Sequence, residues 1–310
     1  MTRFEWAPEQ VKTIKNFMFL MFSTMTLASA LSKPNYSFLY VSLCLGMMTL
    51  SISRFCKVRH AVPAPEVLVL MYSYLSNSFF HFAFSLNLGD VDAFLFSFDR
   101  NYGNFRTVIS NVYSDSFSIR LILGTAYASM MLVLTLAYLA MPDITIRRRF
   151  LVALATTAVL ILPFYLLCPC AGPRYFLQGT PGLNAMPSGH FAWALLIFWF
   201  ARRYCGRAVR VAALVFMVLT CLATLGTGEH YIIDLVVSVP FAAGIWALVH
   251  WQWRFAGISM TVVSAWVIML GEGWALSIPP VPVWIFTGMT LVFFALPNAD
   301  QNQAASVCYA

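Results

Sequence analysis

The chain alternates long apolar runs with short polar segments, and this pattern predicts an all-α protein built within a membrane. The runs are near the roughly 17 to 25 residues that a helix needs to cross the hydrocarbon core. The predicted spans cover residues 17–31, 36–53, 67–88, 119–141, 150–169, 190–204, 208–226, 231–250, 255–271 and 281–297. We therefore expect a polytopic membrane helical bundle of about ten transmembrane helices, because a helix satisfies its backbone hydrogen bonds within its own segment.

The composition agrees with this pattern and leaves no room for a soluble domain. Hydrophobic residues make up 60% of the chain and charged residues 10%, whereas a soluble domain carries about 25% charged residues. Arg3, Lys12 and Lys15 precede the first apolar run, as basic residues do in a signal peptide. No small-residue cleavage site followed by a soluble region comes after them, so we expect this run to be kept as a helix.

The basic residues divide unevenly between the two sides that alternating spans create. Fourteen of the nineteen Lys and Arg residues fall on the side of the two termini, and five fall on the other side. By the positive-inside rule the richer side is cytoplasmic. We therefore expect both termini in the cytoplasm and the loops before residues 190 and 231 in the periplasm, the cell exterior or an organelle lumen. The net charge of +7 follows this topology, so no nucleic-acid partner is expected.

The longest non-cytoplasmic connection, residues 89–118, mixes acidic, basic and aromatic side chains. Such a mixture is typical of a helix that lies at the level of the lipid headgroups. Two interpretations stay open at this point. The segment is either a solvated loop with interfacial aromatic anchors or a lid that gates a site beneath it.

A polar, turn-prone segment interrupts the apolar pattern at Pro187-Ser188-Gly189-His190. Pro187 fixes its own φ, Ser188 is of a type that caps helices, and Gly189 brings no side chain. The next apolar helix begins with His190 in its first turn, and the free N–H groups of a helix start favour an anion such as phosphate. We therefore expect Ser188 and Gly189 to bind phosphate and His190 to act in catalysis.

A second histidine, His230, stands where another apolar helix starts. It is four residues from Asp234, so the two would share one helix face. An ionised Asp in a membrane span costs about 2.5 to 3.5 kcal/mol, so Asp234 needs a partner, and His230 is the available one. A packed structural histidine is the alternative to a catalytic pair. No cluster of His and carboxylate residues has zinc-ligand spacing, so neither a metal nor another cofactor is expected.

These two segments resemble the second and third signature motifs of the type 2 phosphatidic acid phosphatase (PAP2) superfamily. The form His230-Tyr231-Ile232-Ile233-Asp234 is most similar to its sphingolipid-synthase and inositolphosphotransferase branch. The resemblance covers about residues 90–250 and implies a six-helix core with a site at the outer membrane face. The chain would then divide into N-terminal transmembrane helices, a catalytic core, and C-terminal transmembrane helices with a short tail, over residues 1–88, 89–254 and 255–310.

The resemblance also implies a role for each residue. The histidine that matches His230 attacks phosphorus and becomes a phosphohistidine, Asp234 orients it, and His190 protonates the leaving alkoxide. The phosphatases carry an arginine shortly before the nucleophile, but residues 223–229 hold none. Arg174 remains as a phosphate contact, with an interfacial anchor as the alternative. A phosphodiester carries one negative charge and a phosphate monoester two, so fewer cations fit a headgroup transferase better than a phosphatase.

Together these features predict an integral-membrane phospholipid phosphotransferase. It would move a phospho-headgroup, such as phosphoinositol, from a glycerophospholipid donor to the hydroxyl of a lipid acceptor. A lipid phosphate phosphatase that uses water as acceptor is the alternative within the same chemistry. A transporter or a non-catalytic membrane scaffold would also suit many spans, but the chain lacks the internal symmetry that transporters usually show.

Overall fold

A computed structural model of the chain describes residues 91–178 and 186–295. These residues belong to one compact unit, Phe82–Ala310. The proposed N-terminal part lies outside the described residues, and so do its three predicted spans, 17–31, 36–53 and 67–88.

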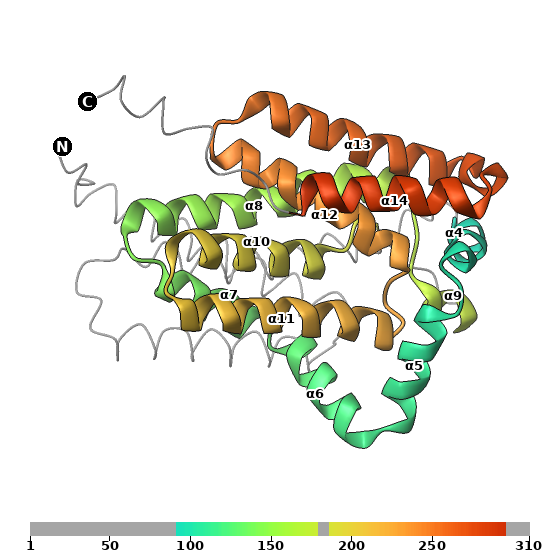
Figure 1. The fold of residues 1–310 in the computed structure, drawn as a ribbon, viewed down its shortest axis with the longest axis horizontal. Helices are drawn as coiled ribbons and strands as arrows, with labels where there is room; N and C mark the ends of the chain where they lie inside the picture. Colours follow the sequence, from blue (N-terminus) through green and yellow to red (C-terminus); the bar gives the residue numbers. More distant parts are fainter. Residues whose placement is uncertain (1–90, 179–185, 296–310) are drawn as a thin grey trace, which may run out of the picture. The chain divides into compact units, whose positions relative to one another are not determined.

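Every regular element in the described residues is helical, which confirms the all-α class (Figure 1). This part of the chain holds eleven α-helices, two 3-10 helices and no strand. In chain order they are α4 (Asp92–Asp99), η1 (Arg100–Tyr102), α5 (Phe105–Asp115), α6 (Phe117–Ala128), α7 (Met130–Ala140), α8 (Ile144–Leu167), α9 (Pro173–Gln178), α10 (Gly189–Tyr204), α11 (Arg207–Gly226), α12 (Ile232–Val249), α13 (Trp253–Gly271), η2 (Trp274–Ser277) and α14 (Pro280–Phe294).

Seven of the predicted spans begin within the described residues, and each coincides with a helix or a helix pair. Four helices, α8, α11, α12 and α13, are long and apolar enough to cross a membrane. The helices α10 and α14 are shorter, with 16 and 15 residues. The apolar helices support an integral membrane protein, while the count of ten spans and the six-helix core stay predictions.

The predicted span 119–141 is broken into α6 and α7, which meet at 57°. The break comes at Ser129, whose hydroxyl donates to the carbonyl oxygen of Ala126 at 3.0 Å. A Ser side chain that binds back to the preceding turn competes with the helical hydrogen bonds and bends the helix. If the pair is counted as one span, the described residues hold five helices or pairs that satisfy the length and apolarity of a crossing.

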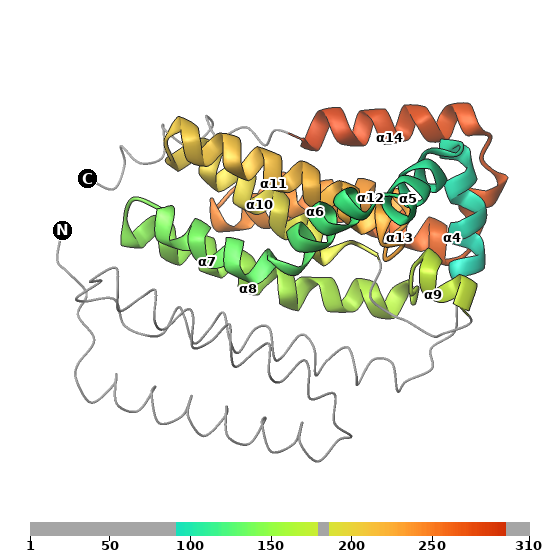
Figure 2. The same cartoon turned by 90° about the horizontal axis from the view of Figure 1, so that it is seen from below.

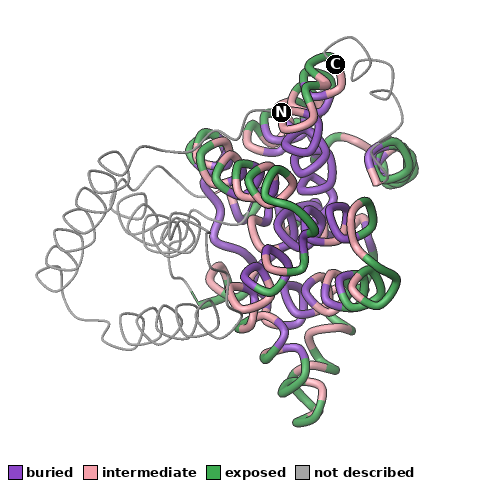
Figure 3. Tube along the Cα trace, turned by 90° about the vertical axis from the view of Figure 1, so that its left-hand side faces the viewer, coloured by how far each residue is buried: buried purple, intermediate pink, exposed green. Residues whose placement is uncertain are grey.

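The helix α12 forms the centre of the described unit. Of its apolar segment 89% is buried, against 33% to 39% in α8, α11 and α13. It packs against α8, α10, α13 and α14, and buried residues run through the middle of the unit in Figure 3. A helix that is apolar on all sides belongs inside a bundle. The helix that carries Asp234 is therefore held from several directions.

The bundle has two chemically different ends. At one end α10 and α12 finish together, where the hydroxyl of Tyr204 lies 3.0 Å from Nε2 of His250. Arg147, at the start of α8, donates there to the carbonyl of Met141 at 2.9 Å. Several of the arginines predicted to be cytoplasmic belong to this end. The helices α4, α5 and α9 gather at the other end (Figures 1 and 2), with the starts of α10 and α12.

From residue 91 on, the connection 89–118 is largely helical, and two of its acidic residues are buried. It forms α4, η1 and α5, and the side chains of Asp92 and Asp99 are buried. The interpretation as a solvated loop is therefore wrong for α4. The helix α5 has no buried residue and exposes Phe105, Val108 and Val112, which suits a helix at the headgroup level.

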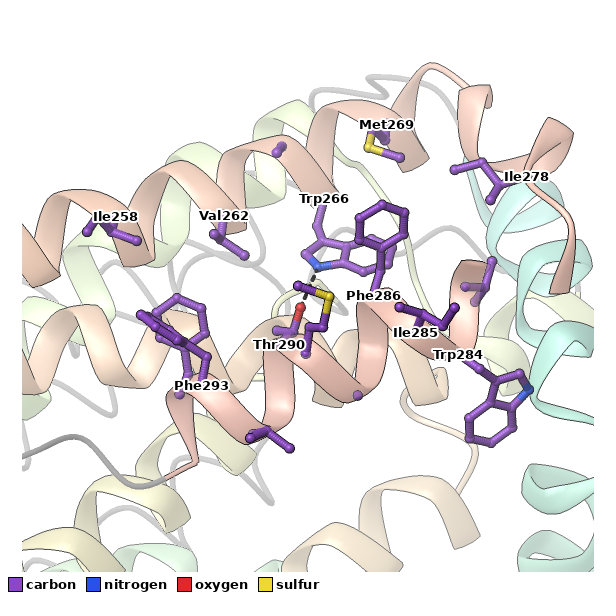
Figure 4. Close-up of a pocket in the computed structure, with 16 residues that line it drawn as sticks. Ile258, Val262, Trp266, Met269, Ile278, Trp284, Ile285, Phe286, Thr290 and Phe293 are labelled. Atoms are coloured by element: carbon purple, nitrogen blue, oxygen red, sulfur yellow. Dashed lines mark hydrogen bonds between the residues drawn. The ribbon is translucent and has the colours of Figure 1, made fainter. Parts of the chain in front are cut away.

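An apolar groove of about 840 Å³ runs between α13 and α14 (Figure 4). Its lining includes Ile258, Met269, Ile285 and Phe293. The indole Nε1 of Trp266 donates to Thr290 Oγ1 at 3.4 Å, so the polar atoms at the base of the groove bind each other. Such a surface is suited to contact with hydrocarbon.

We expect Gly172→Ala to destabilise the end of the bundle that holds α4 and α9. Gly172 has φ of +95°, and a Cβ there would overlap the carbonyl oxygen of Glu229. The strained backbone and this overlap should together cost at least about 2 kcal/mol. Thermal unfolding of the purified protein in detergent should show a lower Tm. Gly206→Ala is the control, because its φ is −66° and a Cβ there meets nothing within 4 Å; an equal loss in both variants would contradict this account.

Candidate active site

The structure brings the two polar motifs together at the start of two helices. Ser188 precedes α10, and His230 precedes α12 by two residues. The hydroxyl oxygen of Ser188 lies 3.0 Å from Nε2 of His230. Both side chains are buried, so residues that are 42 positions apart in the chain share one site.

His230 and Asp234 form a buried pair, although not in the predicted way. Nδ1 of His230 lies 3.3 Å from Oδ2 of Asp234. His230 is outside α12, so the prediction that the two share a helix face is wrong. The carboxylate instead turns back toward the helix start, where Oδ2 also accepts the N–H of Tyr231 at 2.8 Å. A side chain at the third helical position commonly binds the capping residue's N–H in this way.

Ser188 links the two motifs through its backbone as well as its side chain. As the N-cap of α10, its hydroxyl accepts the N–H of Phe191 at 3.4 Å. Its own N–H donates to the hydroxyl of Ser238 at 2.8 Å, and that hydroxyl donates to the carbonyl of Asp234 at 2.6 Å. One turn of α12 therefore fixes the loop that carries Ser188.

Gly189 follows at the first position of α10, close to α8. A Cβ on Gly189 would lie 3.4 Å from Cδ1 of Ile161 and from the hydroxyl of Tyr165. The lack of a side chain lets the start of α10 approach α8. The predicted phosphate contact of Gly189 stays a prediction.

His190 occupies the second position of α10 and is half-buried. The ring of Tyr127 stacks on it with a centroid distance of 4.4 Å and an angle of 20°. The Tyr127 hydroxyl lies 3.5 Å from Nδ1 of His190. The site therefore holds two histidines with different surroundings, one beside a carboxylate and one beside a phenol.

Arg174 lies at the rim, next to the loop that leads to His230. Its N–H donates to the carbonyl of Gly228 at 2.9 Å, and its guanidinium pairs with Glu229 at 3.5 Å. The side chain is 52% exposed. Glu229 also accepts a hydrogen bond from the hydroxyl of Tyr175 at 3.4 Å. Arg174 thus has an acidic partner that the sequence pattern did not predict.

Two contacts join Ser188, His230 and Asp234 into a series that runs from a hydroxyl through an imidazole to a carboxylate. With Nδ1–H donating a hydrogen bond to Oδ2 of Asp234, Nε2 of His230 carries the lone pair. This assignment rests on the hydrogen-bond partners. An imidazole held in one tautomer by a carboxylate is a competent base or nucleophile.

The PAP2 superfamily model matches residues 93–248 of the chain, half of its length. The chain belongs to the PAP2 superfamily. No curated protein and no solved structure matches it. PAP2 membership indicates a lipid enzyme of the phosphatase or phosphotransferase type, and the match contains Ser188, His190, His230 and Asp234.

Two aspartates of α4, missed as site residues in the sequence, brace this PAP2 site. Asp92 accepts the N–H groups of Ala171 and Gly172 at 2.7 and 3.0 Å. It also accepts the hydroxyl of Tyr231 at 2.8 Å. Asp92 therefore ties the segment before Arg174 to the residue that follows His230. In the sequence Asp92 stands close to several aromatic residues, and this mixture predicts a segment at the membrane interface rather than a site residue.

Asp99 binds the same loop at the residue that follows Tyr231. Its Oδ1 accepts the N–H of Ile232 at 2.8 Å, one of the free groups at the start of α12. Its Oδ2 accepts Nε of Arg106 at 3.0 Å. Burial raises the pKa of Asp99 from 3.8 to about 6, and the bonds from Ile232 and Arg106 act in the opposite direction.

This pKa makes stability depend on pH. The folded chain holds the Asp99 proton more tightly than the unfolded chain, so the contribution to stability is fully present below about pH 4 and is lost as the pH rises through about 6. We expect wild-type protein to lose thermal stability as the pH rises from about 4 to about 7. The Asp99→Asn variant has no carboxyl group to titrate at this position, so its thermal stability should fall less over the same pH range.

The measurement is Tm against pH in detergent. Asp115→Asn is the matched control, because Asp115 is an exposed acidic residue at the end of α5. It should keep the wild-type pH dependence. Equal pH dependence in Asp99→Asn and wild type would show that Asp99 does not titrate in this range.

Proposed function

We propose that the protein is an integral-membrane phosphotransferase. It transfers a phospho-headgroup, such as phosphoinositol, from a glycerophospholipid to a lipid hydroxyl through a phosphohistidine at His230. The observation that carries this proposal is the buried Asp234–His230 pair, whose Nε2 lies beside the start of α10, 3.0 Å from the hydroxyl oxygen of Ser188. No metal or other cofactor has a role in this mechanism.

In the first step Nε2 of His230 attacks the phosphorus of the donor. The bond between phosphorus and the diacylglycerol oxygen breaks, and His190 gives its proton to that oxygen. Diacylglycerol leaves, and the phospho-headgroup stays on His230. Nδ1 keeps its proton and donates a hydrogen bond to Asp234, which stabilises the positive charge that develops on the ring.

In the second step the hydroxyl of the acceptor lipid attacks the phosphohistidine. His190, which is now neutral, takes the proton of that hydroxyl, and the bond between phosphorus and Nε2 breaks. The new lipid phosphodiester leaves. His230 is then unmodified again, and His190 is protonated again. In this proposal the N–H groups at the start of α10, with Ser188 and Gly189, bind the phosphate oxygens, for which the Ser188 hydroxyl would exchange its contact with His230.

The charge of the rim favours a diester over a monoester. Arg174 is paired with Glu229, so the net charge of this pair is near zero. A dianionic phosphate monoester would be repelled by Glu229 more strongly than a singly charged phosphodiester. This supports the transferase over the phosphatase alternative, in which water attacks the same phosphohistidine.

The sidedness of the site is also a proposal. The arginines at the starts of α8 and α11 belong to the end opposite the two histidines, and the positive-inside rule places that end in the cytoplasm. Donor and acceptor would then react at the periplasmic, exterior or lumenal face. Both termini would be cytoplasmic.

Product analysis tests the reaction. Purified protein is incubated with mixed phospholipids, with and without a ceramide or diacylglycerol acceptor, and the lipids are measured by mass spectrometry. We expect a new lipid phosphodiester that requires the acceptor. His230→Ala should abolish it, and His190→Ala should reduce it by about 10² to 10⁴-fold, the usual range for a lost general acid.

Asp115→Asn, an exposed charge change on α5, is the control and should leave the product level unchanged. Phosphate release from a monoester without an acceptor would support the phosphatase alternative. A His230→Ala variant with wild-type activity would rule out the phosphohistidine in both reactions.

A further inference from the structure

Tyr127 lies against His190, and the proposed mechanism gives it no role. Its ring stacks on the imidazole with a centroid distance of 4.4 Å and an interplanar angle of 20°. Trp193, one turn further along α10, meets the same imidazole with its ring tilted by 61° and a centroid distance of 6.0 Å. Two aromatic rings therefore restrict the orientation of the His190 imidazole.

The fold supplies Tyr127 from a different helix than the histidine. Tyr127 belongs to the last turn of α6, two residues before the break at Ser129. The helix α6 packs against α11, whereas α7, after the break, packs against α10 and α8. The break thus stands where the chain passes from one neighbour to the next, and from there Tyr127 reaches the start of α10.

The two histidines of the site turn the same ring nitrogen toward a protein partner. Nδ1 of His230 faces the carboxylate of Asp234 at 3.3 Å, and Nδ1 of His190 faces the hydroxyl of Tyr127 at 3.5 Å. The second contact is long for a hydrogen bond, so the stacked ring is the stronger restraint on His190. In both rings Nε2 is then the nitrogen that can act on the donor lipid.

The partners of the two histidines differ in charge, and this difference suits the two tasks of the proposed mechanism. His230 becomes positively charged when it binds phosphorus, and the neighbouring carboxylate stabilises that charge. His190 has to release a proton to the leaving oxygen. A carboxylate beside it would oppose that release by favouring the charged imidazole, whereas a neutral phenol orients the ring without this effect.

We propose that Tyr127 is a positioning residue, which holds the imidazole of His190 by stacking on its face and keeps Nε2 directed at the oxygen of the leaving group. The proposal rests on the proposed function, because Tyr127 acts through the proton that His190 gives. Tyr127 itself exchanges no proton and contacts neither lipid. Catalysis is sensitive to small displacements of a reacting group, so loss of the ring should slow the step that needs the proton.

A pair of donors separates positioning of the acid from general packing. One donor is phosphatidylinositol, and the other is the same lipid with sulfur in place of the oxygen that links phosphorus to glycerol. An alkoxide must be protonated as it leaves, whereas a thiol of the cysteine type ionises with a pKa of about 8.5 and can leave as a thiolate. The first step is measured with protein in excess over donor and without acceptor, as release of diacylglycerol or its thiol analogue.

Removal of the aromatic ring should slow the first step with the oxygen donor only. We expect Tyr127→Leu and Tyr127→Met to slow it by about 30-fold, less than the roughly 10² to 10⁴-fold of a lost general acid. Tyr127→Phe keeps the stacked ring and should slow it by less than about fivefold. All three variants should change the rate with the sulfur donor by less than about threefold, because that step needs no acid.

Tyr204→Phe is the matched control. It removes a hydroxyl that lies 3.0 Å from Nε2 of His250, at the opposite end of α10 from His190, and it should leave both rates unchanged. The Met variant keeps the test valid if the Leu variant does not fold, because a flexible Met side chain adapts to the space that the ring leaves.

Equal slowing of both donors would overturn the proposal, because it would show that Tyr127 only packs against the site. Unchanged rates in Tyr127→Leu and Tyr127→Met would overturn it as well, and so would a Tyr127→Phe variant that is as slow as these two. His190→Ala separates this failure from a failure of the mechanism. If it slows the oxygen donor far more than the sulfur donor, the acid role of His190 stands and only the role of Tyr127 is wrong. If it affects both donors alike, the proposed mechanism fails, and the proposal fails with it.

Discussion

The buried carboxylate of Asp234 is the constraint on which the site depends. An ionised carboxylate inside a bundle is stable only if hydrogen bonds replace its lost water. Asp234 meets part of this need with Oδ2, which accepts the N–H of Tyr231 and faces Nδ1 of His230, while its buried Oδ1 has no hydrogen-bond partner among the described residues. The contacts of Oδ2 also hold the imidazole in one orientation. The partial compensation of the carboxylate and the orientation of His230 therefore come from the same contacts.

Two other buried aspartates extend this arrangement to the surrounding loops. Asp92 binds the backbone of residues 171 and 172, and Asp99 binds the first N–H of α12. Each replaces the water lost by a carboxylate with backbone N–H groups that would otherwise lack partners. The short helix α4 thus fixes residues 171 and 172 and the two residues that follow His230. In a membrane protein with few charged residues, three buried aspartates at one end mark where function constrains the sequence.

The sequence predicts the parts of this structure that follow from one continuous pattern. The apolar runs give α8, α10, α11, α12 and α13 with errors of a few residues, because helices in a membrane need length and apolarity. The motif around Ser188 and the pair of His230 and Asp234 also meet in space, because turn residues and helix starts leave a local signal.

What the sequence could not show depends on contacts between distant segments. The sequence predicts Asp92 and Asp99 to be solvated, because the backbone N–H groups that they bind lie more than 70 positions away in the chain. The bend at Ser129 leaves the apolar pattern intact, so the run 119–141 looked like one span. Arg174 appeared as an isolated cation because Glu229 comes 55 positions later, and tertiary packing alone brings the two together.

The most direct test of the account is the mass of a trapped enzyme intermediate. Purified protein is mixed with a phosphatidylinositol donor without acceptor and quenched in denaturant at neutral to alkaline pH, and the intact mass and the peptide containing His230 are measured. The account predicts an adduct of one phosphoinositol group on His230, with one diacylglycerol released. An unmodified His230 in protein that turns over the same donor, or an adduct on another residue, would contradict it.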